Sequence, residues 1–410
     1  MDESLFFVEE KVINDTKTTL KTIDQLSIEM IKSSYQNLFK RYKTLFKQFR
    51  RLIKLSDIQQ LRLKFLNDAL EIRNLFIKKT FGRYLSDDIV KTLLETPDGL
   101  ELGGERRVVT IMMTDLRGFT ALCENLSPED VLTIINTYLE IMTEVILKYN
   151  GTIDEIIGDG LFIIFGAPIQ NDDDAKRSVA CAIEMQKTMS LVNQRINELG
   201  FPEIELGIGL NTGEVVVGNI GSNIRTKYGL IGSNVNLTAR IESYTVGGQI
   251  FISENTLKAC EDLLRVDNTF EILPKGVATP INIYEIGGIN EPYNLFLPKK
   301  NENEMKNLEE PMHIEFSNIS EKHVSDVKIS ASIVKLNKTG CIIECEIKIK
   351  PFSNIKISLF DYKKNLITQD LYAKVEKNII DNPFQFKINF TSTPHNIQEY
   401  LKSIKYFSAK

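Results

Sequence analysis

The sequence predicts an α+β domain in the middle of the chain, preceded by a helical segment and followed by a small β-barrel or sandwich. Three patterns predict this arrangement. Residues 1–80 carry apolar side chains at helical spacing, residues 106–287 alternate strand-like and helix-like segments, and residues 311–410 alternate apolar and polar side chains in period two. With 410 residues, of which 42% are hydrophobic, the chain is long enough for two or three domains with their own cores.

The first 80 residues are predicted to be helical and to dimerise the chain. Their 4-3-4-3 spacing is typical of a coiled-coil seam or a helical bundle. The side chains of this stripe are Leu38, Tyr42, Leu45, Phe49 and Leu52. Between positions 30 and 56 there are eight Lys or Arg and no acidic residue. This charge fits an amphipathic helix on anionic lipid, a contact with a partner protein, or a solvated helix face.

Two aperiodic segments separate the predicted domains. Residues 81–105 hold a short helix and then a stretch rich in Pro and Gly, which indicates a transducer or linker. Residues 288–310 are polar and without period, so they are predicted to be a second linker.

The central region, 106–287, is predicted to hold a mainly antiparallel sheet with helices. An apolar strand ends at Asp115, and Ser127 followed by Pro128 is typical of a helix start. The other elements expected here are a hairpin of residues 151–157 and 161–168, a helix over 171–200, a second hairpin of 204–210 and 214–220 around Asn211-Thr212-Gly213, a helix opened at Ser233, and strands at 249–254 and 281–287.

Composition excludes several classes of protein. The net charge of −5 does not favour a nucleic acid as partner, and no apolar run is long enough for a membrane span. Five scattered cysteines form no zinc or redox spacing, and the acidic start of the chain is unlike a secretory signal, so we expect a cytoplasmic protein. All three histidines lie after residue 310, so chemistry in the central domain must proceed without histidine.

Two carboxylates stand out by their positions. Asp115 ends an apolar strand before a glycine-containing turn, and Asp159 lies between two glycines at the tip of a predicted hairpin. Carboxylates at strand ends bind hard divalent cations, and the amides near Gly118, Phe119 and Thr120 are placed to face phosphates. The pattern therefore suggests a magnesium–triphosphate site, although Asp-Gly is also a common turn dipeptide.

Three further residues suit a nucleotide. Asn236 and Arg240 are four positions apart on the helix opened at Ser233, so a polar group and a fixed cation share one face. Lys275 precedes a glycine on a turn, where it would reach a phosphate. Taken alone, Arg240 also fits a surface salt bridge and Lys275 a solvated turn.

In combination, five segments resemble the class III adenylyl/guanylyl cyclase catalytic domain over about residues 106–287. The segments are TDLRGFT, EIIGDGLFIIFGAP, NTGEVVVGNIGS, YGLIGSNVNLTARIESYTVGGQIFIS and PKGVATPINIYEI. The resemblance implies a ferredoxin-like α+β fold, a head-to-tail homodimer, and conversion of a nucleoside triphosphate to the 3′,5′-cyclic monophosphate and pyrophosphate.

The same resemblance implies roles for individual residues. Asp115 and Asp159 look like the pair that binds two metal ions, Mg²⁺ or Mn²⁺. Asn236 and Arg240, in the VNxxxR motif, look like the pair that orients the ribose and stabilises the pentavalent phosphorus. Lys275 resembles the lysine that binds the triphosphate. In the family the metal ligands come from one protomer and Asn and Arg from the other, so each site would be shared.

The resemblance also indicates where the base is recognised. Four residues before Asp159, where adenylyl cyclases carry Lys, this chain has Glu155, which we expect on a strand face shared with Ile153 and Ile157. A carboxylate accepts the two donors of guanine and repels the bare N1 acceptor of adenine. The second base position is Gly229, which departs from both family patterns because it has no side chain to accept from adenine. The sequence therefore favours GTP over ATP, unless Glu155 is only paired across the sheet.

The C-terminal part, 311–410, resembles a PilZ-type β-barrel. Such domains bind cyclic di-GMP through a pair of arginines and a DxSxxG-like turn. Here the segment LNKTG only approximates the turn, and no arginine follows Arg265. A protein-interaction or structural barrel is therefore favoured over a cyclic di-GMP site.

The sequence thus predicts a dimeric purine nucleotide cyclase that prefers GTP. The alternatives are an adenylate cyclase that uses ATP and a catalytically silent module that binds nucleotide for signalling. Occupation of the metal, ribose and phosphate positions by competent residues favours an enzyme over the silent module.

Overall fold

A computed structural model provides the coordinates of the chain. The residues that the structure describes are 7–22, 27–81, 101–124, 126–222, 224–274, 277, 279–299, 305–320, 323–337, 339–361, 363–379, 382–392, 397, 400 and 404. The chain divides into two units, Met1–Phe81 and Gly82–Lys410. Most of the predicted transducer, Lys275, and most of the predicted C-terminal helix lie outside the described residues.

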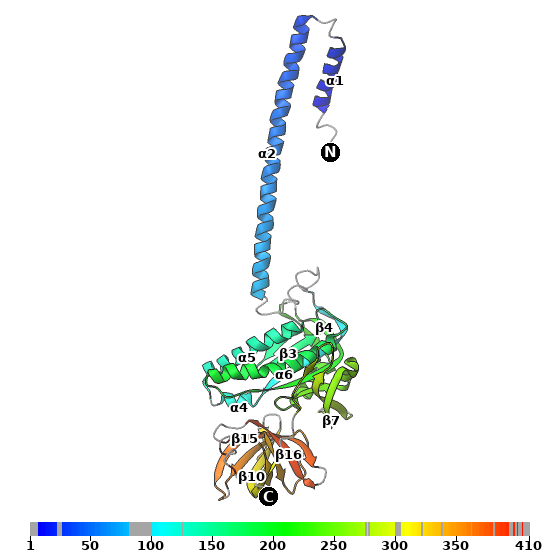
Figure 1. Ribbon diagram of the computed structural model, residues 1–410. Coiled ribbons are helices and arrows are strands. Elements are labelled where there is room, and N and C mark those ends of the chain that lie inside the picture. Colours follow the sequence, from blue (N-terminus) through cyan, green and yellow to red (C-terminus); the bar gives the residue numbers. More distant parts are fainter. Residues whose placement is uncertain are drawn as a thin grey trace. The chain divides into compact units, whose positions relative to one another are not determined.

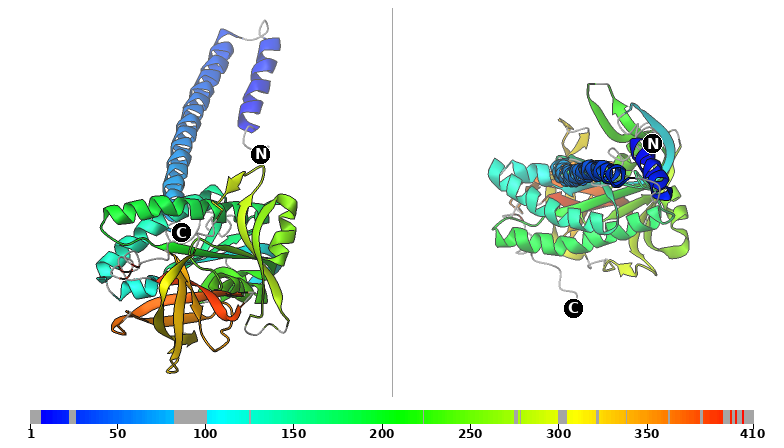
Figure 2. Two further views of the ribbon diagram at one scale, coloured as in Figure 1. Left: turned by 60° about the horizontal axis from the view of Figure 1, so that its bottom comes forward. Right: turned by 90° about the horizontal axis from the view of Figure 1, so that it is seen from above.

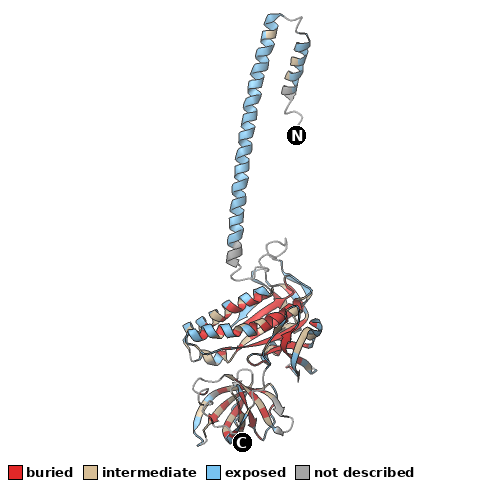
Figure 3. Ribbon diagram, in the orientation of Figure 1, coloured by how far each residue is buried: buried red, intermediate tan, exposed pale blue. Residues whose placement is uncertain are grey.

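The first unit contains two helices, α1 (Phe7–Lys21) and α2 (Ile28–Phe81) (Figure 1). At 1.5 Å per residue, the 54 residues of α2 extend for roughly 80 Å. The apolar stripe that predicts a coiled coil is exposed along α2 (Figure 3). Pairing of this stripe with a second chain stays a prediction. None of the helices in the described ranges combines the length and the apolar character needed to cross a bilayer.

The central part of the second unit is built on a nine-stranded sheet, in the order β2-β3-β1-β4-β6-β8-β7, with β5 on β4 and β9 on β8. Each pairing in it is antiparallel except that of β4 with β6. The strands are β1 (Gly103–Arg117), β2 (Thr152–Ile157), β3 (Gly160–Phe165), β4 (Glu205–Gly221), β5 (Thr226–Ile231), β6 (Ile250–Ser253), β7 (Leu264–Ile272), β8 (Ile281–Ile289) and β9 (Leu295–Phe296).

The helices lie on both faces of this sheet. They are α4 (Phe119–Cys123), α5 (Pro128–Lys148), α6 (Asp174–Glu198), α7 (Ser233–Ser243), α8 (Glu254–Ala259) and a 3₁₀ turn at Glu261–Leu263. Helices α5 and α6 run side by side over one face and close the main core (Figures 1 and 2). Helix α7 packs on the opposite face, where its Val235 meets a smaller cluster that includes Val109 and Ile111. Ser127 caps α5 by accepting a hydrogen bond from the Asp130 amide, as its position predicts.

The predicted second hairpin is wrong, because β4 runs without a turn from Glu205 to Gly221 and pairs with β1 along its whole length. Two of its polar side chains donate hydrogen bonds to helices that pack on the sheet, while the Oδ1 atom of Asn211 is buried without a hydrogen bond. The side chain of Asn211 donates to Asn234 of α7, and the hydroxyl of Thr212 donates to that of Thr256. A Cβ at Gly213 would lie only 2.4 Å from the Asn234 side chain. The turn-like triplet therefore serves close packing of α7 and not a change of direction.

The C-terminal part of the second unit is a closed barrel, as predicted. Strands β10, β12, β13, β16, β15 and β14 form a ring that the pairing of β14 with β10 closes, and β11 extends β10 outside it. The bounds are β10 (Lys306–Ser320), β11 (His323–Val324), β12 (Ile329–Leu336), β13 (Gly340–Glu344), β14 (Asn354–Phe360), β15 (Leu366–Ile379) and β16 (Asn382–Ser392). The barrel interior is a separate apolar core that includes Phe316, Ile333 and Phe386.

Candidate active site

Asp115 and Asp159 lie at neighbouring strand ends. Asp115 is two residues before the end of β1, and Asp159 is at the tip of the predicted β2–β3 hairpin, where Ile157 pairs with Gly160. Burial raises the pKa of Asp159, and the negative charge of Asp115 raises it further. The two carboxylates are therefore close enough to repel each other.

The hairpin is fixed to β1 by close backbone contact. A Cβ at Gly160 would lie 2.5 Å from the carbonyl oxygen of Thr114, so only glycine fits there. The Thr114 hydroxyl oxygen accepts a hydrogen bond from the Leu161 amide at 3.2 Å. The same hydroxyl lies 3.3 Å from the hydroxyl of the fully buried Tyr138. These contacts hold Asp159 at a set position relative to Asp115.

The two carboxylates fit a divalent cation. Within the described ranges no group of three or more His, Cys, Asp or Glu side chains converges on a possible metal position. A cation held by Asp115 and Asp159 would therefore take its other oxygen ligands from backbone, water and substrate phosphate, as Mg²⁺ commonly does. It would also remove the repulsion that raises the pKa of Asp159.

The turn after β1 places backbone amides beside this pair. Gly118 has the positive φ of 71° that precedes the five-residue helix α4. Phe119 is 5% exposed and belongs to the main core, so its side chain is structural and only its amide would face a ligand. Thr120 is exposed.

Asn236 and Arg240 lie on the outer side of α7, where Asn236 is exposed and Arg240 half-buried. Their neighbours Thr238 and Ile241 face the sheet and are buried. In the described part of the chain, no hydrogen bond or ion pair joins either side chain to Asp115 or Asp159. The structure therefore does not bring the two pairs into contact within one chain. Lys275 lies outside the described residues.

Glu155 lies on the same strand face as Ile157, as predicted, but not on the face of Ile153. A β-bulge between Ile153 and Glu155 leaves Ile153 opposite Ile163 and Glu155 opposite Phe162, which face opposite sides of the sheet. The exposed Glu155 carboxylate accepts a hydrogen bond from the Lys227 ammonium group at 2.8 Å. A single sequence gives no signal for such a bulge, because it inserts a residue without changing composition.

Asp154, which sequence reasoning missed, forms an ion pair with Lys227. The Lys227 ammonium group lies 3.1 Å from Asp154, whose side chain is 2% exposed. Burial raises the pKa of Asp154, and Lys227 opposes this shift. A Cβ at Gly229 would lie 3.7 Å from the Asp154 carboxylate, whose Oδ1 atom is buried without a hydrogen bond. Gly229 therefore adjoins Asp154.

A buried ion pair, also missed, connects the end of β1 to α7. Arg117 donates to Asp115 at 3.0 Å, to the Glu242 carboxylate and carbonyl oxygens, and to the Thr245 hydroxyl at 2.7 Å. The side chains of Arg117 and Glu242 are only 11% and 13% exposed. Burial raises the pKa of Glu242 to about 7, while Arg117 counteracts the rise. A Cβ at Gly207 would overlap Arg117 and Thr245, so glycine makes the room that this network occupies.

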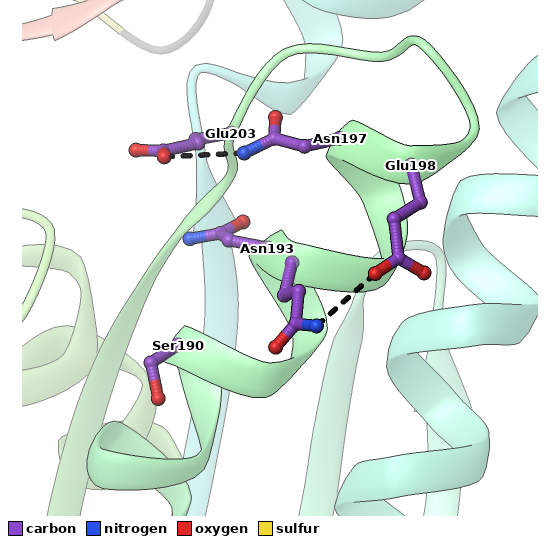
Figure 4. Close-up of a pocket in the computed structure, with 6 residues that line it drawn as sticks. Ser190, Asn193, Asn197, Glu198 and Glu203 are labelled. Carbon is purple, nitrogen blue, oxygen red and sulfur yellow. Dashed lines mark hydrogen bonds between the residues drawn. The ribbon is translucent and has the colours of Figure 1, made fainter.

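A pocket at the end of α6 contains none of the predicted site residues. Ser190, Asn193, Gln194, Asn197, Glu198 and Glu203 line it (Figure 4). Two hydrogen bonds within the pocket, Gln194 to Glu198 and Asn197 to Glu203, already satisfy part of its polar surface.

Comparison with known proteins identifies the domain that contains Asp115, Asp159, Asn236 and Arg240. Residues 104–285 match the family model described as "Adenylate and Guanylate cyclase catalytic domain". "Adenylate cyclase 1" of Rhizobium meliloti is 29% identical over 217 residues, which cover 52% of this chain and 33% of the relative. "Adenylate cyclase" of Anabaena cylindrica is 30% identical over 236 residues, which cover 53% and 45%. The chain thus spans a third to about half of the length of these relatives.

Solved structures of both kinds of cyclase are similar to the chain. The guanylyl cyclase Cya2 is 54% identical and covers 48% of this chain and 100% of its own, with a TM-score of 0.47. The adenylyl cyclase CyaB from P. aeruginosa is 35% identical and covers 46% of this chain and 98% of its own, with a TM-score of 0.45.

Proposed function

Residues 104–285 form a class III adenylate/guanylate cyclase catalytic domain, a lyase, and on that premise we propose that the chain forms a cyclic purine nucleotide, with GTP as the preferred substrate. The reaction converts the triphosphate to its 3′,5′-cyclic monophosphate and pyrophosphate. The observation that carries this proposal is the placement of two carboxylates, Asp115 and Asp159, at the ends of adjacent paired strands.

Asp115 and Asp159 would hold two divalent ions, Mg²⁺ or Mn²⁺. Bound there, such ions lower the pKa of the ribose 3′-hydroxyl group and neutralise phosphate charge. The amides of Gly118, Phe119 and Thr120 would bind phosphate oxygens by hydrogen bonds. With metal ions activating the ribose hydroxyl group and amides binding the phosphates, the reaction needs no histidine base. This agrees with the absence of histidine before residue 310.

Asn236 and Arg240 act on the other side of the nucleotide in this proposal. Asn236 orients the ribose, and Arg240 stabilises the negative charge that develops on the transferred phosphorus group. Lys275 contributes a further positive charge to the triphosphate.

The position of these residues supports a homodimer with shared sites. Asn236 and Arg240 lie on the outer side of α7, and within the described residues they make no hydrogen bond or ion pair with the two aspartates of their own chain. A second protomer would supply them to the site. The exposed apolar stripe of α2 gives the chain a further surface for pairing.

Preference for GTP rests on Glu155 and Gly229. The exposed Glu155 carboxylate accepts a hydrogen bond from Lys227 at 2.8 Å, and its remaining acceptor capacity would take hydrogen bonds from the N1–H and amino groups of guanine. Gly229 offers no side chain to accept from the amino group of adenine. Adenine therefore gains nothing at either position, and its N1 atom is repelled by the carboxylate.

An assay of purified protein with GTP and ATP, in Mg²⁺ and in Mn²⁺, tests the proposal. We expect cyclic GMP as the main product, and loss of turnover in Asp115→Ala and in Asp159→Ala without unfolding. Retained turnover in both variants would refute the metal assignment, and cyclic AMP as the main product would refute the GTP preference.

A further inference from the structure

One buried lysine side chain of the β-barrel contacts the catalytic domain. Lys374 of β15 is 3% exposed, and its ammonium group donates to the carbonyl oxygens of Ser243 at 2.5 Å and of Thr245 at 2.8 Å. Lysine is almost never buried to this extent unless it is paired. These two carbonyl groups lie at the end of α7 and just beyond it. Barrel and catalytic domain are thus joined by two buried hydrogen bonds from Lys374.

An aromatic contact to the end of α7 lies beside Lys374. Phe352 of the barrel packs edge-on against Tyr244, with ring centres 5.2 Å apart, and joins the apolar cluster of Phe251 and Phe270. Its amide donates to the carbonyl oxygen of Val375, the residue after Lys374, at 2.7 Å. Lys374 and Phe352 are therefore fixed to each other and meet the end of α7 together.

Helix α7 depends on such contacts for its position. It has eleven residues, and its N-cap, Gly232, makes no side-chain capping hydrogen bond. A helix of this length is marginal by itself, and its last carbonyl groups need donors. At its C-terminal end, Arg117 and Lys374 supply these donors from two different domains.

We propose that Lys374 is a positioning residue for the cyclase reaction, which holds the end of α7 so that Asn236 and Arg240 meet the nucleotide. This inference rests on the proposed function, and it makes the barrel a structural part of the catalytic site. The link is short, because the Ser243 hydroxyl donates to the carbonyl oxygen of Arg240 at 2.7 Å. A small displacement of a catalytic group costs up to about 100-fold in rate. Loss of the hydrogen bonds from Lys374 to the end of α7 should therefore lower kcat.

The first test compares Lys374→Met with wild type and with Lys348→Met, which removes an exposed barrel lysine. We expect kcat to fall at least ~10-fold in Lys374→Met, with KM within about twofold, because metal and phosphate binding are retained. Lys348→Met should match wild type, and Lys374→Arg, which keeps both donors, should recover activity. As a control, thermal unfolding is measured for each variant to establish that it is folded at the assay temperature. If Met at this position prevents folding, Lys374→Gln replaces it with the same expectations.

The second test locates the effect within a mixed dimer. Chains carrying Asp159→Ala and Arg240→Ala are co-expressed with different affinity tags, so that the one working site takes α7 from the Asp159→Ala chain. Adding Lys374→Met to that chain should lower turnover at least ~10-fold, whereas adding it to the Arg240→Ala chain should change little.

Equal losses in both placements, or a kcat of Lys374→Met within twofold of wild type, would overturn the inference. Wild type without turnover on either nucleotide would instead overturn the proposed function, so the two failures are distinguishable.

Discussion

Arg117 is predicted to contribute strongly to the attachment of α7 to the sheet. In Arg117→Met, the hydrogen bonds to Asp115, Glu242 and Thr245 are lost together, and the Glu242 carboxylate remains at 13% exposure without its cation. Removal of one partner of a buried ion pair costs about 3–5 kcal/mol. For a domain of this size that corresponds to a fall in Tm of roughly 6–20 °C.

Thermal unfolding at pH 8, above the pKa of about 7 that Glu242 has in the wild-type protein, measures this cost. Arg106→Met is the matched control, because the Arg106–Glu214 pair is 78% and 55% exposed and should contribute less than about 1 kcal/mol. In the double variant Arg117→Met/Glu242→Leu the unpaired charge is gone, so most of the stability should return. The reasoning is refuted if Arg117→Met costs less than about 1 kcal/mol or if the double variant is no more stable than Arg117→Met.

Three other predictions concern the same region. Gly160→Ala should lower stability by about 1–3 kcal/mol and turnover with it, because the new Cβ would meet the Thr114 carbonyl oxygen at 2.5 Å; wild-type kcat and Tm would contradict this. Because the folded-state pKa of Glu242 is raised from 4.5 to about 7, its contribution to stability is complete below pH 4.5 and is lost as the pH rises through 7. When the free energy of unfolding is measured against pH without added metal, Glu242→Gln should not show this loss of about 3 kcal/mol. The same pH profile for wild type and Glu242→Gln would disprove the assignment. Glu155→Lys should lower kcat/KM for GTP relative to ATP, and an unchanged ratio would remove Glu155 from base recognition.

Local signals in the sequence were sufficient where a short segment determines its own structure. The β2–β3 hairpin could be predicted because Gly158 adopts a positive φ of 64° at the turn and two apolar runs flank it. The cap of α5 at Ser127 and the period-two pattern of the barrel strands are equally local. The positions of Asp115 and Asp159 followed from these elements.

Long-range packing explains what the sequence did not reveal. Asn211-Thr212-Gly213 has turn composition, yet it lies in the middle of β4, where the side chains of Asn211 and Thr212 donate hydrogen bonds to α7 and α8. The bulge at Asp154 depends on the pairing register of β2 with β3, which no local pattern reports.

The partners of Arg117 and Lys374 are also distant in sequence. The guanidinium group of Arg117 contacts residues 125 and 128 positions away, and Lys374 bonds to a carbonyl group 131 positions away. Such contacts exist only once the sheet, α7 and the barrel are assembled.

The central claim, that this domain forms a cyclic purine nucleotide with GTP as the preferred substrate, is tested most directly by one measurement. Purified protein is incubated with equal concentrations of GTP and ATP in Mg²⁺ and in Mn²⁺, and the products are identified by mass spectrometry. The account predicts cyclic GMP and pyrophosphate, with cyclic AMP as the lesser product. Cyclic AMP in excess would contradict the role given to Glu155 and Gly229, and the absence of both products in either metal would contradict the claim of catalysis itself.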